Sequence, residues 1–231
     1  FQSRILGYDL NPDYVGVSVI EFRKDDTFKI LHKEVFDLSL LQEKPTGKIR
    51  YELFELDHRI LRLCHTWRCA RLAVEDLRFD GKRRFWSARL NRLCRNRFRF
   101  AQVKRHLATL CGTFGVELVE VNAAYSSVIG NFRHGSPTCP DMAAAATEIA
   151  RRAHHKFQKG WIRPSVVPTR RIREVLGNQW KEEREPIPAS WRVLSGKIKE
   201  LGLRYRFPLN PSNAVFSKTY TKSYITVHNF S

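Results

Sequence analysis

The sequence predicts an α/β fold in which helices cover both faces of a five-stranded mixed sheet. Residues 4–36 form three apolar runs separated by short polar breaks, the pattern of an antiparallel meander. Helical patterns and short apolar runs then alternate along the chain, as in a sheet whose parallel strands are joined by helices. The chain has 231 residues, of which 42% are hydrophobic, and this suffices for the core of one such domain.

Turn residues and alternating valines mark the three strands of the meander. The turn after the first strand is Asn11-Pro12-Asp13, and the charged residues 23–26 separate the second strand from the third. In the second strand Val15, Val17 and Val19 alternate with small residues, so one face of this strand is expected to be buried. The strands are predicted at residues 4–10, 14–22 and 27–36.

Helical patterns follow the meander. A predicted helix at residues 48–69 carries an apolar stripe at steps of three and four, formed by Leu53, Leu56, Ile60, Leu63 and Trp67. Residues 122–139 are rich in Ser, Gly and Asn and are expected to form a loop. The remaining elements are predicted as a strand at 71–75, a helix at 85–112, a strand at 116–121 and a helix that begins at Asp141. This element order is that of the RNase H-like (RuvC) fold.

The two ends of the chain differ from this pattern. Six prolines follow Gly160, and only residues 190–201 have a helical pattern in this part. We therefore expect one folded domain at residues 4–160 and an irregular extension at 161–231 without a separate core. Its expected anchors are Trp161, Trp180 and Trp191. Phe1-Gln2-Ser3 (residues 1–3) resembles the remnant of a cleaved expression tag, so the native protein is expected to begin upstream.

The composition points to a polyanionic partner. Lys and Arg number 41 against 23 acidic residues, a formal net charge of +18, which indicates a nucleic acid rather than a requirement of solubility. No run of about 18 apolar residues exists, so no membrane span is predicted. Five cysteines without regular spacing and the lack of a signal peptide predict a cytoplasmic protein.

The basic residues are most concentrated in the second predicted helix. Residues 78–106 hold eleven Lys or Arg and a single acid, so the usual intrahelical ion pairs cannot form there. A charged helix face is ordinarily solvated, but this imbalance favours contact with the phosphate backbone of a nucleic acid. The predicted contact residues are Arg89, Arg92, Arg95, Arg99, Arg151 and Arg152.

Three acidic residues stand at the ends of three predicted elements. Asp9 lies near the end of the first strand, Glu75 ends the fourth, and Asp141 opens the last helix of the domain. In a sheet of the predicted order the first and fourth strands are neighbours, and the last helix starts beside their ends. The three carboxylates are therefore expected to converge. Converging carboxylates repel one another unless cations bind between them. This is the donor set of a two-metal site that cleaves phosphodiester bonds, with Mg²⁺ or Mn²⁺ as cofactor.

Each acid also has a structural interpretation. Asp9 could cap the turn that follows it, and Glu75 could end its strand at the surface. Thr138 and Asp141 have the spacing of a helix capping box, so that Asp141 could serve only the start of its helix. Weaker candidates for the same metal site are Asp13, Asp76 and Asp80.

Short motifs around these acids resemble those of TnpB (OrfB) proteins from bacterial insertion sequences. Gly7-Tyr8-Asp9-Leu10 is similar to the first RuvC-type motif of that family and Val74-Glu75-Asp76-Leu77 to its second. Asp141-Met142-Ala143-Ala144-Ala145 resembles the third motif, although Met142 stands where that family has another residue. Ala124-Tyr125-Ser126-Ser127 lies where the family has a Thr-Ser element. The resemblance covers about residues 4–160.

The resemblance implies a metal-dependent endonuclease domain, related to type V CRISPR effectors, that cuts DNA under the guidance of an RNA. It assigns Asp9, Glu75 and Asp141 as metal ligands and catalytic residues. The guide-binding region of the family is absent from this sequence and would lie upstream. The family's four-cysteine zinc ribbon is also missing, since residues 128–140 hold only Cys139 and His134 as zinc-type ligands; no zinc is therefore expected.

Two other functions share some of these features. A nucleic-acid-binding scaffold with an idle nuclease site would have the same fold and charge, and only metal-dependent cleavage would separate it from an active enzyme. An actin-like or sugar-kinase ATPase also opens with a strand that carries Asp. Such an enzyme needs glycine-rich phosphate loops, and the turns at residues 11–13 and 23–26 hold no glycine.

Overall fold

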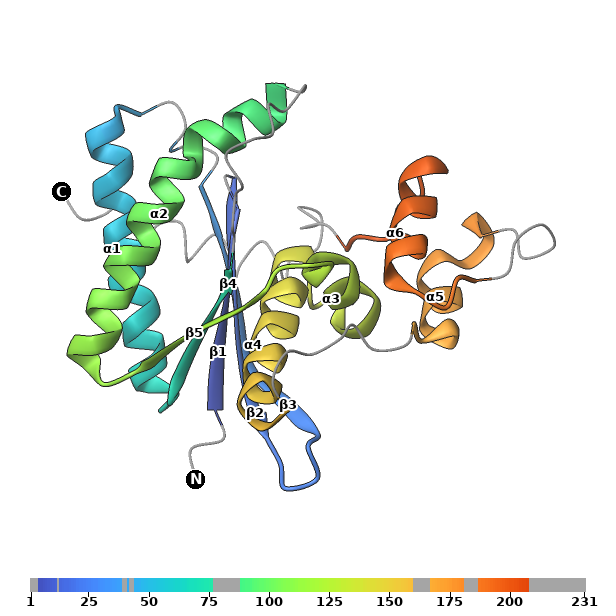
Figure 1. Ribbon diagram of the computed structural model, residues 1–231, viewed down its shortest axis with the longest axis horizontal. Helices are drawn as coiled ribbons and strands as arrows, with labels where there is room; N and C mark the ends of the chain where they lie inside the picture. The colour runs from blue at the N-terminus through green and yellow to red at the C-terminus, as the bar shows by residue number, and fades with distance from the viewer. Residues whose placement is uncertain are drawn as a thin grey trace.

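The computed structural model describes most of the 231 residues (Figure 1). The described residues are 4–11, 13–38, 41, 44–76, 88–159, 167–180 and 187–207, of which 88–100 and 155–159 are described by their backbone only. Within this part of the chain, no helix is both long and apolar enough to cross a membrane.

The centre of the molecule is a five-stranded sheet in the order β3-β2-β1-β4-β5. β1 pairs antiparallel with β2, and β2 with β3, while β4 pairs parallel with both β1 and β5. The strands span Arg4–Leu10, Tyr14–Phe22, Phe28–Asp37, Arg71–Asp76 and Glu117–Asn122. A meander of three strands extended by two parallel strands is the topology of the RNase H-like fold, as the sequence predicted.

Helices cover both faces of the sheet (Figure 1). On one face α1 (Thr46–Thr66) and α2 (Ala88–Phe114) pack together and onto the sheet. Their apolar side chains form the largest core cluster, in which Leu6 and Tyr8 of β1 meet Ile60 of α1 and Leu107 of α2. On the other face α4 (Asp141–Lys159) lies across β1 and β2. Because side chains alternate along a strand, Ile5 faces α4 whereas Leu6 faces α1.

Glycines let α4 approach the sheet very closely. A Cβ atom on Gly7 would lie 1.9 Å from the carbonyl oxygen of Ala146, and one on Gly16 would lie 2.2 Å from that of Met142. Residues 143–146 are alanines, all buried, so small side chains occur on both sides of the interface. The close packing therefore depends on the absence of a Cβ atom at these strand glycines and not on their conformational freedom.

The predicted loop at residues 122–139 was wrong, because it contains helix α3 at Ser126–His134. Its apolar residues Val128, Ile129 and Phe132 are buried, and Gly130 lies against the backbone of Ala144 in α4. The Ser, Gly and Asn content that suggested a loop therefore serves close helix packing and polar contacts. Tertiary contacts outweigh a weak intrinsic helix propensity here.

The C-terminal part contains α5 (Thr169–Leu176), the short 3₁₀ helix η2 (Gly177–Gln179) and α6 (Trp191–Glu200). α6 agrees with the helical pattern at 190–201, whereas α5 was not predicted. Both helices lie beside α3 (Figure 1). The apolar side chains of these helices form one cluster with those of α3, and Trp180 and Trp191 are buried in it; Trp161 lies outside the described residues.

Candidate metal centre

The strand pairing places Asp9 beside Glu75. Tyr8 of β1 is paired with Val74 of β4 in a parallel register, so the next residues of the two strands are neighbours on the opposite face of the sheet from Tyr8. That face is the one that α4 covers. Both acids therefore lie at the carboxyl ends of parallel strands and point toward the same helix.

The seating of α4 brings Asp141 to the same place. Asp9 pairs with Gly16 of β2, and Gly16 lies against Met142 at the start of α4. From the contact of Gly7 with Ala146, Asp9 is two strand residues away and Asp141 five helix residues away. These steps correspond to about 6.6 Å and about 7.5 Å in the same direction. The ends of β1 and α4 thus meet at the same level.

Burial and mutual repulsion make this cluster a high-energy arrangement of negative charge. Asp9 is buried, with 4% of its surface exposed. Burial raises the pKa of Asp9 well above its usual range, and the neighbouring carboxylates of Glu75 and Asp141 raise it further. Burial likewise raises the pKa of Glu75 and of Asp141. A bound cation would reverse these shifts, because it favours the charged form of each carboxyl group.

Each of the three carboxylates is oriented by a polar side chain. Asn11 donates a hydrogen bond to Asp9 at 2.8 Å. The Ser126 hydroxyl donates to Glu75 from the start of α3. Asp141 accepts a hydrogen bond on Oδ1 from the side-chain amide of Asn131, also in α3, and the guanidinium of Arg206 lies 3.2 Å from its Oδ2.

These contacts test the structural interpretations of the same acids. Asp9 does bond to Asn11 of the turn that follows it, whereas the interpretations of Asp141 and Glu75 do not hold. The Thr138 hydroxyl pairs with Ser136 at 3.2 Å, while the Asp141 side chain contacts Asn131 and Arg206, so the capping box is not the role of this pair. Glu75 is partly buried and not at the open surface. Of the weaker candidates, Asp13 is exposed, Asp76 is partly buried, and Asp80 lies outside the described residues.

The donor set suits a hard divalent cation, which binds carboxylate oxygens. Burial raises the pKa of all three acids, although the charge of Arg206 opposes this at Asp9 and Asp141 and that of Arg152 opposes it at Glu75. In the present arrangement no group of three His, Cys, Asp or Glu side chains within the described ranges is close enough to form a complete metal site. The three acids fit a hard metal ion by the chemistry of their oxygen donors, and Asp9, Glu75 and Asp141 are the residues that would hold it.

Two of the predicted DNA-contacting arginines have a different role. Arg151 donates two hydrogen bonds of 2.8 Å to Glu148, and Arg152 donates one of 3.0 Å. Both guanidinium groups are buried, with Arg152 also bonded to the carbonyl oxygen of Asn122. They neutralise a buried carboxylate inside α4, so we leave them out of any nucleic-acid surface.

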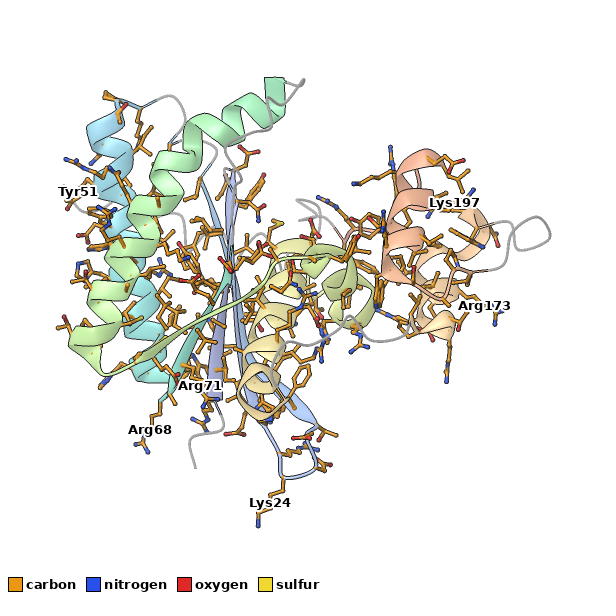
Figure 2. The ribbon with its side chains drawn as sticks, in the orientation of Figure 1. Lys24, Tyr51, Arg68, Arg71, Arg173 and Lys197 are labelled. Atoms are coloured by element: carbon orange, nitrogen blue, oxygen red, sulfur yellow. The ribbon has the colours of Figure 1, made fainter. Side chains whose placement is uncertain are left out.

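The other four predicted contact residues, Arg89, Arg92, Arg95 and Arg99, lie in the part of α2 whose side chains are outside the described set. Their helix is present as predicted. Positive side chains also point outward from other elements: Figure 2 shows Lys24 at the tip of the β2–β3 hairpin, Arg68 after α1 and Arg173 on α5. The excess charge is thus carried by several elements.

Four residues of the site were missed from sequence: Asn11, Ser126, Asn131 and Arg206. Asn11 was assigned to a turn and Ser126 only to a motif, although Asn11 directly follows the strand that carries Asp9. Asn131 was hidden in the supposed loop. Arg206 lies 65 positions after Asp141 in an extension without a recognisable pattern, and no local signal connects the two.

Comparisons with known proteins give distant structural similarities. No protein-family model matches the chain, and no curated protein matches it. Among solved structures, RuvC from Thermus thermophilus in complex with Holliday junction substrate has 15% sequence identity and a TM-score of 0.49, covering 68% of this chain and 97% of that one.

Two further solved structures show the same kind of distant likeness. The Fowlpox virus resolvase with Holliday junction DNA has 11% identity and a TM-score of 0.39, and the match covers 68% of this chain and 99% of that one. A Ppx/GppA family protein from Aquifex aeolicus has 11% identity and a TM-score of 0.35, covering 56% and 38% of the two chains. The fold of this chain is defined by its own strand order and directions, independently of these similarities.

Proposed function

We propose that this chain is the nuclease domain of a divalent-metal-dependent endonuclease that cleaves DNA phosphodiester bonds. The observation that carries the proposal is the convergence of Asp9, Glu75 and Asp141 at the carboxyl ends of β1 and β4 and the start of α4. Burial and mutual repulsion disfavour their charged forms. A protein whose only need was a stable core would gain by replacing such acids with apolar or neutral residues.

The residues have separate tasks in the proposed reaction. Asp9, Glu75 and Asp141 would hold Mg²⁺ or Mn²⁺, which when bound supplies Lewis-acid stabilisation of charge on the phosphate and lowers the pKa of water. Asn11, Ser126 and Asn131 orient the three carboxylates. The arginines of α2 would contact the DNA backbone without reading its sequence.

The finer proposal is an RNA-guided, transposon-associated endonuclease of the TnpB type. Its support is the match of three motifs to three elements that meet at one site: β1 with Asp9, β4 with Glu75 and α4 with Asp141. The fourth motif also falls at this site, because Ser126 contacts Glu75. A guide RNA would then be bound by a region upstream of this sequence.

A second candidate function is a DNA-binding scaffold with an idle nuclease site. Two observations favour it: Arg206 already pairs with Asp141, and the three acids do not form a complete metal site within the described part of the chain. This candidate retains the fold and the net charge of +18 and differs only in chemistry.

Cleavage and binding measured on the same protein distinguish the two candidates. We expect the full-length protein with its own RNA to cut target DNA in Mg²⁺, and Asp9→Asn to lower the cleavage rate at least about 10³-fold while target affinity in EDTA changes little. Asp25→Asn in the exposed β2–β3 turn is the matched control, because Asp25 hydrogen-bonds to Thr27 within its own turn. A complex that binds its target but never cuts in Mg²⁺ or Mn²⁺ would establish the scaffold.

A further inference from the structure

The segment at residues 203–207, which we call the strap, returns from the end of α6 to the carboxylate site. The side-chain amide of Gln179 donates a hydrogen bond of 3.0 Å to the carbonyl oxygen of Arg204, and its Oε1 accepts one of 3.1 Å from the backbone N–H of Arg204. The Tyr205 ring stacks on Phe132 of α3 at a centroid distance of 5.5 Å. The strap is therefore fixed on α3 and η2 before it reaches the site.

The end of the strap is bonded to the start of α4. The backbone N–H of Asp141 donates to the carbonyl oxygen of Phe207 at 2.9 Å. The N–H of Phe207 donates to Oδ1 of Asn131 at 3.3 Å, and the amide of Asn131 in turn donates to the Asp141 carboxylate. Asn131 thus connects the strap to the carboxylate that the strap covers.

Arg206 brings a positive charge from the strap to the carboxylates of Asp141 and Asp9. Its Nη1 lies 3.2 Å from Oδ2 of Asp141, and its Nε donates to the Tyr205 hydroxyl at 3.3 Å. Its charge also favours the ionised form of Asp9. With Asn131 on Oδ1 and Arg206 on Oδ2, both oxygens of Asp141 are already engaged.

We propose that Arg206 is a resident counter-cation that keeps the carboxylate site closed to divalent metal while the strap is docked. The proposal rests on the assignment of Asp9, Glu75 and Asp141 as metal ligands. A guanidinium at Oδ2 excludes a metal ion from the same oxygen and repels its double charge. Once the strap loosens, the side chain can swing away from Asp141, since 54% of it is exposed. A nucleic-acid phosphate would offer the guanidinium a bidentate partner, so binding of nucleic acid would favour loading of metal.

The test is the affinity of the nucleic-acid-free protein for Mn²⁺, measured by calorimetry on the whole chain. We expect Arg206→Ala to bind Mn²⁺ about tenfold more tightly than the wild type, because one positive charge leaves the site. Arg204→Ala is the matched control: it removes the same charge from the same strap, and the contacts of Arg204 run through its backbone to Gln179. This control is expected to bind Mn²⁺ within about twofold of the wild type.

A second variant and a second readout keep the proposal falsifiable. Gln179→Ala loosens the strap without touching the acids and should tighten Mn²⁺ binding about two- to threefold. In metal-free buffer Arg206→Ala should melt at a lower temperature than Arg204→Ala, because the three acids lose their counter-cation, and saturating Mn²⁺ should remove that difference.

The outcomes separate this proposal from the proposed function. If Asp141→Asn abolishes Mn²⁺ binding but Arg206→Ala binds Mn²⁺ no more tightly than Arg204→Ala, the metal assignment stands and the closing role of Arg206 is refuted. If neither the wild type nor Arg206→Ala binds Mn²⁺ at millimolar concentration, both proposals fail. Weaker binding by Arg206→Ala would show that the arginine assists the metal instead of excluding it.

Discussion

The contact between Gly7 and Ala146 gives the sharpest test of how this molecule is built. Gly7→Ala would place a Cβ atom 1.9 Å from the Ala146 carbonyl oxygen and 2.9 Å from the backbone nitrogen of Ala150. Both atoms belong to the backbone of α4, so no side chain can rotate to relieve the overlap. The helix or the strand must move by about 1.5 Å to restore an ordinary contact.

The expected cost follows from that displacement. Overpacking of a core costs about 1–3 kcal/mol, and we expect the upper end of this range because only backbone atoms oppose the new methyl group. For a chain of this size about 3 kcal/mol corresponds to a fall in Tm of about 6–12 °C. Gly7 is in the same strand as Asp9 and contacts α4, the helix that carries Asp141. The same shift should therefore separate the carboxylates and slow cleavage about 10²-fold.

Thermal unfolding followed by circular dichroism provides the measurement, with Gly196→Ala as its control. Gly196 lies in α6 with no atom within 4 Å of its added Cβ, so alanine there should be neutral or stabilise the helix by up to about 1 kcal/mol. If Gly7→Ala melts within about 2 °C of the wild type, α4 is not seated on β1 as described, and the argument for convergence of the acids loses its basis.

Three further predictions concern charge. Asp57→Asn in α1 should make the unfolding free energy less dependent on pH. Burial raises the pKa of Asp57 to about 8, so its carboxylate costs stability increasingly as the pH rises from about 4 to about 8, with an upper limit of about 6 kcal/mol. Urea unfolding at pH 5 and pH 8 measures this, and equal pH slopes would contradict it. Glu148→Gln leaves Arg151 and Arg152 buried without their carboxylate and should cost about 3–5 kcal/mol in urea unfolding at pH 7, whereas a loss below about 1 kcal/mol would show that the network is dispensable. Each phosphate contact releases counterions, so alanine substitution of four α2 arginines should lower the slope of log affinity for DNA against log salt by about 3–4. The four are Arg89, Arg92, Arg95 and Arg99. An unchanged slope would mean that this helix face is only solvated.

The sheet and its order could be predicted because each strand is marked locally. Polar turns separate the apolar runs, and the alternating valines of β2 predict one buried face. In the structure residues 15–20 are all buried, because helices cover both faces of the sheet. The placement of Asp9, Glu75 and Asp141 at element ends was visible for the same reason. Their convergence also required the register of β1 with β4, which follows once the sheet order is known.

The missing parts are those whose signal is tertiary. α3 has the composition of a loop, and it is helical because three apolar side chains are buried and Gly130 packs on α4. Arg151 and Arg152 read as surface charge since nothing near them in sequence shows that Glu148, three and four residues earlier, is buried. Arg206 reaches Asp141 only through the packing of α5 and α6 on α3.

The two acids of α4 show how a structural carboxylate differs from a functional one in the same helix. Glu148 is fully buried, but Arg151 and Arg152 bond to it directly, and these contacts hold its pKa well below the usual range. Asp141 lies two turns earlier, where burial raises its pKa even though Arg206, which it shares with Asp9, lowers it. The chain therefore has the means to neutralise a buried acid completely and does so where only stability is served. At the end of β1 the three acids keep raised pKa values despite Arg206 and Arg152, and a bound divalent cation would favour their charged forms.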